Sequence, residues 1–139
     1  MNAKAFLDSN ILVYAFDSGY PEKQRCAQRC IQNGLLQEDL ALSPQVLSEF
    51  FVVVTRKIAK PLSAAGALEI IETLQTLVTV DIDYGLVVRA IEAQVKFKIS
   101  YWDGLIIAAA ERAQCNQILS EDLNAGQTYW GIRVENPFQ

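Results

Sequence analysis

Short apolar runs alternate with longer stretches of helical periodicity along the whole chain. Short β-rich runs of three or four residues predict strands at 5–7, 40–42, 77–80, 117–119 and 132–134. Helices are predicted to start near Pro21, Pro44, Ser63, Asp83 and Ser100, because proline, serine and aspartate favour the first positions of a helix. This alternation is typical of an α/β fold with a mainly parallel sheet, here of five strands.

Two of the predicted helices carry most of the apolar side chains. Residues 45–58 place Leu47, Phe50, Phe51, Val54 and Ile58 at helical spacing, so this segment should bury a wide face, with a glutamate at position 49 on its edge. Residues 101–114 are apolar nearly all round. We therefore expect the second helix to lie at the centre of the fold.

Four carboxylates interrupt or end apolar stretches: Asp8, Glu49, Asp103 and Asp122. In parallel α/β sheets, ligands bind at the carboxyl ends of the strands, where such residues would meet. Clusters of oxygen ligands suit Mg²⁺ or Mn²⁺ and phosphate chemistry. The pattern predicts a divalent metal site built from these four side chains.

Each acid also has an ordinary structural explanation. Asp8 can cap a helix that begins near Ile11. Glu49 can be a surface residue paired with a basic side chain. The segment from Ser100 to Asp103 has the form of a capping box. Taken singly, none of these residues identifies a metal site.

Asp122 competes with its neighbour Glu121, because alternation along a strand sends the two side chains to different sides. We favour Asp122, since Ser120 lies two residues earlier and would point the same way to support a ligand. A polar turn, or the cap of a short helix near Leu123, is the alternative for this segment.

The amino-acid composition excludes several kinds of catalytic site. The 139 residues are 51% hydrophobic and include no histidine, which excludes Ser-His-Asp and Cys-His triads and histidine general bases. The length predicts a single domain, 1–139. No apolar run approaches the roughly 18 residues of a membrane span, and three cysteines form no disulfide pattern. We expect a cytoplasmic protein.

The net charge is −4, from 12 Lys and Arg against 16 Asp and Glu. An acidic chain is a poor partner for nucleic acid unless its acids bind cations, which invert the local field. Two basic clusters then become candidate RNA contacts. They are formed by Arg56, Lys57 and Lys60, and by Lys96 and Lys98.

The acidic segments together resemble PIN-domain ribonucleases of the VapC toxin type. Four segments carry the resemblance in order, FLDSNIL at 6–12, LSEF at 47–50, YWDGLI at 101–106 and LSEDLN at 119–124, followed by a last-strand segment at 132–138. The resemblance implies an α/β/α sandwich, Mg²⁺- or Mn²⁺-dependent RNA cleavage, a cognate antitoxin and homodimerisation. It also implies roles as catalytic metal ligands for Asp8, Glu49, Asp103 and Asp122, with Asn10 and Ser120 as supporting polar residues.

Two other classes of function compete with a nuclease. A PIN-like module could bind an antitoxin or RNA without cutting it, although the intact acids argue against this. A phospho-acceptor domain also places an aspartate after the first strand, but the segment from Asp8 to Asn10 lacks the second acid of a D-x-D motif. A metal-dependent nuclease is the better interpretation.

Overall fold

The computed structural model describes residues 3–139, and the short apolar runs of the sequence form its sheet. The central strand β1 (Ala5–Leu7) pairs in parallel with β2 (Leu40–Leu42) and with β4 (Gln117–Leu119). Strand β3 (Val78–Thr79) extends the sheet beyond β2, and β6 (Ile132–Glu135) extends it beyond β4, both in parallel. Because β1 and β4 are neighbours with Leu7 opposite Leu119, the residues that follow them lie side by side.

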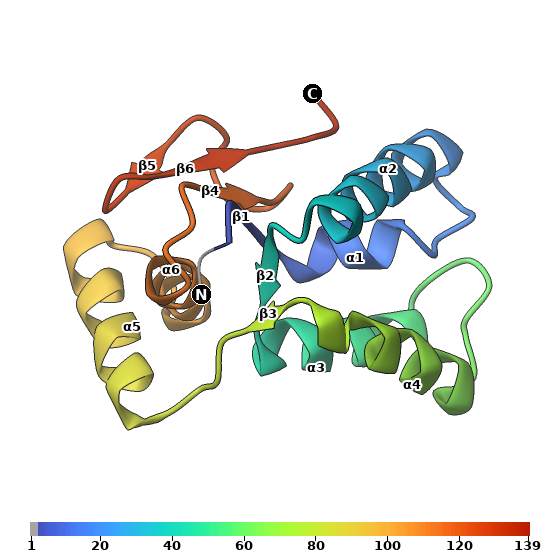
Figure 1. Cartoon of the computed structure of the whole chain (residues 1–139), viewed down its shortest axis with the longest axis horizontal. Helices are drawn as coiled ribbons and strands as arrows, with labels where there is room; N and C mark the ends of the chain where they lie inside the picture. Colours follow the sequence, from blue (N-terminus) through green and yellow to red (C-terminus); the bar gives the residue numbers. More distant parts are fainter. Residues whose placement is uncertain (1–2) are drawn as a thin grey trace.

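Helices cover both faces of the sheet. They are α1 (Ser9–Tyr14), α2 (Pro21–Gln37), α3 (Pro44–Val54), α4 (Ala64–Thr73), α5 (Tyr84–Phe97) and α6 (Tyr101–Arg112), with a 3-10 turn, η1 (Leu74–Thr76). Figure 1 shows α5 and α6 on one face and α1 and α2 on the other. The predicted three-layer α/β/α sandwich around a mainly parallel sheet is therefore confirmed.

The helix starts follow the sequence signals. Proline occupies the first turn of α2 and of α3. The side chains of Ser63, Asp83 and Ser100 accept hydrogen bonds from backbone N–H groups in the first turns of α4, α5 and α6. Such caps satisfy N–H groups that have no partner within the helix.

Helix α6 is the central helix, as its composition predicts. Every residue from Gly104 to Ala110 is buried, and the helix contacts β1, β2, β4 and β6. Helix α5 packs along it so closely that a Cβ at Gly104 would lie 2.5 Å from the carbonyl oxygen of Ala90. Glycine is needed at this position because any side chain would collide with the α5 backbone.

The prediction of five strands is wrong, since residues 3–139 form a sheet of six, in the order β3-β2-β1-β4-β6-β5. The missed strand, β5 (Thr128–Tyr129), pairs antiparallel with β6 through a two-residue turn. Trp130 and Gly131 form this turn with φ of 49° and 81°, the positive values that tight hairpin turns require. The strand could not be predicted because two residues are too few to show the alternation of a strand. The turn gave no signal either, because tryptophan seldom adopts a positive φ.

Other boundaries also differ from the predictions. Strand β3 is two residues long rather than four. Helix α3 ends at Val54, and Ile58 is buried from the following turn rather than from the helix. Residues 1 and 2 of the predicted domain lie outside the described residues.

In the described part of the chain, no helix combines the length and the apolar character needed to cross a bilayer. The three cysteines, Cys26, Cys30 and Cys115, are free thiols.

Candidate functional site

Asp8 lies where β1 ends and α1 begins, and it is only 7% exposed. Its Oδ1 accepts the backbone N–H of Ser9 at 2.7 Å, so it does cap α1. Its Oδ2 accepts the Ser120 hydroxyl at 2.7 Å and the Asn10 amide at 3.2 Å. Asp8 therefore caps α1 with one carboxylate oxygen and takes part in a polar cluster with the other.

Burial raises the pKa of Asp8 to about 6. The hydrogen bonds from Ser120 and Ser9 act in the opposite direction, while the negative charges of Glu49 and Asp122 raise the pKa further. A carboxylate in this position lacks a compensating positive charge.

The Asn10 side chain joins the two strand-end acids. Its Oδ1 accepts the backbone N–H of Glu121 at 3.0 Å, which turns its Nδ2 toward the carboxylates. That nitrogen donates to Asp122 Oδ2 at 3.1 Å, besides its contact with Asp8. One amide thus holds both acids within reach of each other.

Glu49 approaches the cluster from α3 and is half-buried. The Ser9 hydroxyl donates to its Oε1 at 3.1 Å, which connects α3 to the start of α1. The alternative of a pairing with a basic side chain is not realised, because no ion pair of residues 3–139 involves Glu49.

Asp103 stands in the first turn of α6. Its backbone N–H donates to the Ser100 hydroxyl at 3.0 Å, the capping interaction that the sequence suggests. Partial burial raises the pKa of its carboxyl group; the Ser100 hydroxyl opposes this and the charge of Asp122 adds to it. Asp103 therefore lies within electrostatic reach of Asp122.

The two consecutive acids after β4 have different surroundings. Asp122 is exposed and faces Asn10. Glu121 forms an ion pair with Lys23 and accepts the hydroxyl of Tyr14 at 2.8 Å. Asp122, rather than Glu121, thus shares its surroundings with Asp8 and Asp103.

The cluster suits a hard cation in its chemistry, because all of its donors are oxygen atoms. Within residues 3–139, however, no three acidic or cysteine side chains stand close enough together to be recognised as a metal site. The fit rests on the raised pKa of Asp8 and of Asp103, both of which a nearby cation would lower. Asp8, Asp103, Asp122 and Glu49 are the side chains that could hold it.

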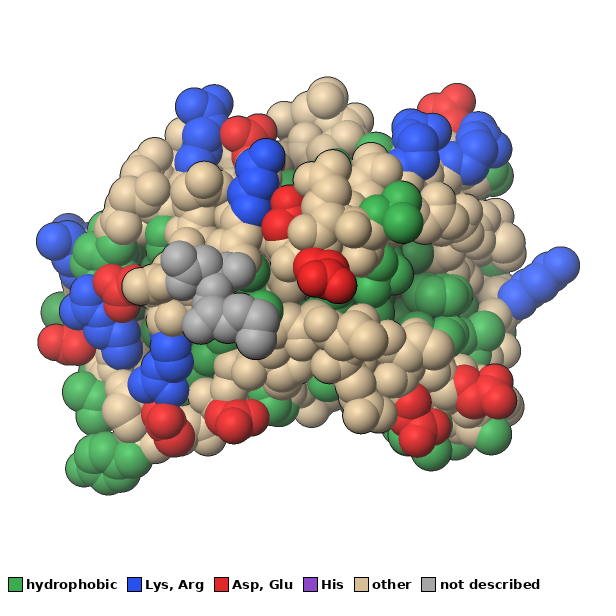
Figure 2. Space-filling view, in the orientation of Figure 1, with side chains coloured by type: hydrophobic (Ala, Val, Ile, Leu, Met, Phe, Trp, Pro, Cys, Tyr) green, Lys and Arg blue, Asp and Glu red, His purple; other side chains and the backbone are tan. Residues whose placement is uncertain are grey.

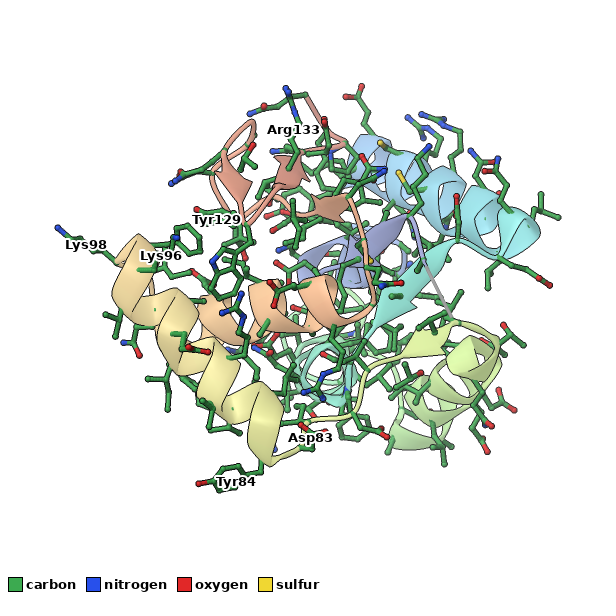
Figure 3. All side chains as sticks on the ribbon, turned by 60° about the vertical axis from the view of Figure 1, so that its left-hand side comes forward. Asp83, Tyr84, Lys96, Lys98, Tyr129 and Arg133 are labelled. Carbon is green, nitrogen blue, oxygen red and sulfur yellow. The ribbon has the colours of Figure 1, made fainter. Side chains whose placement is uncertain are left out.

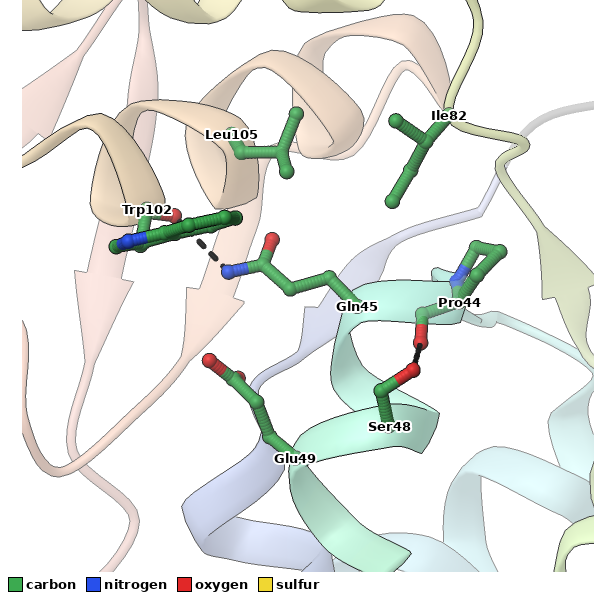
Figure 4. A pocket seen from close by; sticks show the side chains of 7 residues that line it. All are labelled: Pro44, Gln45, Ser48, Glu49, Ile82, Trp102 and Leu105. Carbon is green, nitrogen blue, oxygen red and sulfur yellow. Dashed lines mark hydrogen bonds between the residues drawn. The ribbon is translucent and has the colours of Figure 1, made fainter. Parts of the chain in front are cut away.

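Two hollows flank the cluster. One, of about 440 Å³, lies between α3 and α6 and is lined by Pro44, Gln45, Ser48, Glu49, Ile82, Trp102 and Leu105 (Figure 4). The other, of about 280 Å³, includes Ser9, Asn10, Tyr14, Lys57 and Asp122. The acids therefore lie between two spaces that a ligand could enter.

The predicted basic contacts divide between two places. Lys57 lines the smaller hollow, and Arg56 and Lys60 are exposed near it in the sequence. Lys96 and Lys98 lie at the end of α5, opposite Asp83 and Tyr84 (Figure 3), and Lys96 lines a separate pocket with Trp130. Figure 2 shows basic and acidic side chains interspersed over the visible face, without one large basic patch.

Sequence reasoning missed three residues that shape the site: Ser9, Gln45 and Trp102. Ser9 follows Asp8 at a helix start, a position that brings its hydroxyl to the neighbouring α3. Gln45 lies one helical turn before Glu49, and Trp102 directly precedes Asp103. Their proximity to the acids in sequence is a signal that could have identified them.

The family model described as the PIN domain matches residues 5–130 of this chain. No curated protein matches the sequence closely enough to count as a relative.

Several solved structures share the fold. A toxin-antitoxin complex from Klebsiella pneumoniae aligns with a TM-score of 0.70 and 18% identity, covering 96% of this chain and 98% of that one. VapC20 of Mycobacterium tuberculosis, described as a toxin that cleaves the sarcin-ricin loop, aligns with a TM-score of 0.65 and 18% identity, over 86% and 92% of the two chains. DNA-bound VapBC from Salmonella typhimurium aligns with a TM-score of 0.67 and 16% identity, over 97% and 98%. At these identities the likeness establishes the fold.

Proposed function

The chain belongs to the PIN-domain family, and from this premise we propose that it is a divalent-metal-dependent endoribonuclease, the toxin of a toxin-antitoxin pair. The observation that carries the proposal is that the charges of Glu49 and Asp122 act on Asp8, and the charge of Asp122 acts on Asp103, although the four residues are far apart in the sequence. Residues as far apart as 8 and 122 in the sequence meet through a single asparagine.

The chain's own residues would prepare the site for an Mg²⁺ or Mn²⁺ ion. Asp8 and Asp103 would be its main ligands, with Glu49 and Asp122 completing the cluster. When bound, such an ion supplies Lewis acidity toward a phosphate and a more acidic water. Asn10 and Ser120 hold Asp8 in a fixed orientation, and Ser9 does the same for Glu49.

The toxin role is supported by the structural neighbours, two of which are described as toxin-antitoxin or VapBC assemblies. Helices α3 and α4 pack together and expose Phe51, Val52 and Leu68, a surface on which an amphipathic antitoxin segment could bury its apolar side. We also propose that the protein forms a homodimer and acts in the cytoplasm. Sedimentation of the purified chain tests the dimer, and gene neighbourhood tests the antitoxin.

Cleavage of a mixed pool of structured RNAs tests the nuclease. The wild type should cut in Mg²⁺ or Mn²⁺ and not in EDTA, and Asp8→Ala and Asp103→Ala should each lose the activity. Asp81→Ala is the matched control, because Asp81 is an exposed aspartate outside the cluster. Cutting that persists in EDTA or in both site variants would overturn the proposal.

The metal has its own test in thermal melting. Millimolar Mn²⁺ should raise the melting temperature of the wild type by several degrees, since a ligand that binds only the folded state stabilises it. Asp8→Ala should reduce this shift. If Mn²⁺ leaves the melting temperature unchanged and gives no binding heat, the proposal of a metal site is wrong. A module that binds RNA or antitoxin without cutting then becomes the better explanation.

A further inference from the structure

One side chain in the larger hollow has an unmet hydrogen-bonding requirement. Gln45 is 8% exposed, and its Oε1 has no hydrogen-bond partner within the described residues. Buried polar atoms are nearly always paired, so an unpaired one calls for an explanation. A ligand that brings a hydrogen-bond donor into this hollow would provide it.

The orientation of the Gln45 amide is fixed by its other contact. Its Nε2 donates to the backbone carbonyl of Trp102 at 3.2 Å. A carbonyl oxygen can only accept, so the nitrogen must face it and the oxygen must be the free atom. The neighbouring Glu49 carboxylate is also an acceptor. The polar side of the hollow thus favours a ligand rich in N–H groups.

The apolar side of the hollow offers a flat aromatic surface. Trp102 is 62% exposed although it is the largest side chain in the lining, and Figure 4 shows its ring beside the Gln45 amide. Pro44, Ile82 and Leu105 complete the apolar lining. Exposed aromatic rings are the usual platforms on which unpaired nucleobases stack.

The hollow is continuous with the acidic cluster. Gln45 and Glu49 are one helical turn apart on α3, and Trp102 and Asp103 are consecutive on α6. One turn is about 5.4 Å, a step comparable with that from a phosphate to its base. A phosphate held near Glu49 would therefore place a neighbouring base against Gln45 and Trp102.

We propose that the hollow between α3 and α6 binds one unpaired RNA base beside the cleaved phosphate, with Trp102 stacking on the base and Gln45 Oε1 accepting a hydrogen bond from its exocyclic amino group. The inference rests on the proposed nuclease function and adds to it a preference for particular bases next to the cleaved phosphate. Because Oε1 is shielded from solvent, the side chains that cover it must move aside to admit the base.

The chemistry predicts which bases are accepted. Adenine, cytosine and guanine each carry an exocyclic amino group that can donate to Oε1, whereas uracil has none and presents a carbonyl oxygen where cytosine has its amino group. A carbonyl would face the Gln45 oxygen and the Glu49 carboxylate, two acceptors. RNA with adenine or cytosine at this position should bind more tightly than RNA with uracil.

The test is equilibrium binding of fluorescent single-stranded oligoribonucleotides of about eight nucleotides, all adenine, all cytosine or all uracil. The protein carries Asp8→Asn, so that cleavage is blocked, and Mg²⁺ is present. The adenine and cytosine oligomers should bind about 10-fold more tightly than the uracil oligomer. Gln45→Met should abolish this difference by weakening the first two, and leave uracil binding within about twofold.

Trp102 gives an independent readout in the same assay. Trp102→Ala should weaken all three oligomers by about 10-fold, because stacking does not depend on the base, and Trp102→Phe should retain most of the affinity. This exposed residue can be changed without disturbing the core, so the test stands even if Gln45→Met fails to fold. Gln94→Met and Tyr84→Ala, both exposed on α5, are controls that should match the parent.

The inference is overturned if no oligomer binds, if Gln45→Met keeps the preference, or if Trp102→Ala binds like the parent. The experiments distinguish an error in the proposed base pocket from an error in the proposed nuclease function. RNA cleavage that requires Asp8, without any effect of Trp102 or Gln45, refutes the pocket alone. Base-selective binding without cleavage by the wild type refutes the nuclease alone.

Discussion

The hydroxyl of Ser120 donates a 2.7 Å hydrogen bond to Oδ2 of Asp8, joining the ends of the neighbouring strands β1 and β4. The Ser120 hydroxyl oxygen also accepts the backbone N–H groups of Asp122 at 3.2 Å and Leu123 at 3.3 Å. Ser120 is fully buried. It therefore determines both the orientation of one acid and the position of the next.

Replacing Ser120 by alanine should lower the free energy of unfolding by about 1–3 kcal/mol, because Asp8 Oδ2 and the backbone N–H groups of Asp122 and Leu123 each lose a hydrogen bond. Urea denaturation at pH 7 measures the change. Ser48→Ala is the control: the Ser48 hydroxyl is exposed and bonds only within α3, so its loss should change stability by less than about 0.5 kcal/mol. Equal stabilities for the two variants would show that the Ser120 contacts contribute little.

Asp8 should make the metal-free protein less stable as the pH rises. Its pKa is raised from 3.8 to about 6 by burial, so the folded state prefers the protonated form. The stability that this preference contributes is complete below pH 3.8 and is lost as the pH rises through 6. At 1.36 kcal/mol per pKa unit, the loss is about 3 kcal/mol.

Urea denaturation in EDTA from pH 4 to 7.5, for the wild type and Asp8→Asn, measures this loss. The asparagine cannot ionise, so the wild type should lose about 2.4 kcal/mol relative to the variant over that range. Parallel stability curves would mean that the carboxyl group of Asp8 titrates normally in the folded protein.

Asp122→Asn and Glu121→Gln should have unequal effects on RNA cleavage. Asp122 faces Asn10 and the cluster, so its neutralisation should reduce cleavage by about 10-fold or more. Glu121 is engaged with Lys23 and Tyr14, and its neutralisation should change the rate by about twofold at most. A larger loss in Glu121→Gln would reverse the assignment of the fourth acid.

Gly104→Ala should destabilise the protein by about 1–3 kcal/mol, because the new methyl group would lie 2.5 Å from the Ala90 carbonyl oxygen and force α5 and α6 apart. Thermal and urea unfolding measure the loss. Gly85→Ala is the matched control on α5, where the nearest atom is the flexible Arg112 side chain at 3.4 Å; this change should be neutral or slightly stabilising. Similar losses in both variants would argue against a close approach at Gly104 in particular.

The sequence predicted those parts of the fold that have a strong local signal. Three-residue apolar runs marked β1, β2 and β4, and Ser63, Asp83 and Ser100 marked helix starts that the structure confirms. The four acids could be singled out because each stands beside an apolar stretch, where a surface charge is unusual.

The remaining features depend on contacts between distant segments. Strand β5 is two residues long and exists through its pairing with β6. The different surroundings of Glu121 and Asp122 are set by Lys23 and Asn10, which lie about a hundred positions earlier in the chain. The unpaired oxygen of Gln45 follows from the position of α6, which no local pattern encodes.

Because β1 lies at the centre of the sheet and pairs with β4, the acidic cluster can form only late in the synthesis of the chain. Asp8 is made long before its Ser120 partner, which directly follows β4, and before β4 itself, which pairs with one edge of β1. A nascent chain that stops before residue 117 has neither, and it also lacks Asp122. The acidic cluster can therefore assemble only once β4 has been made and has paired with β1, so an unfinished chain lacks the candidate site.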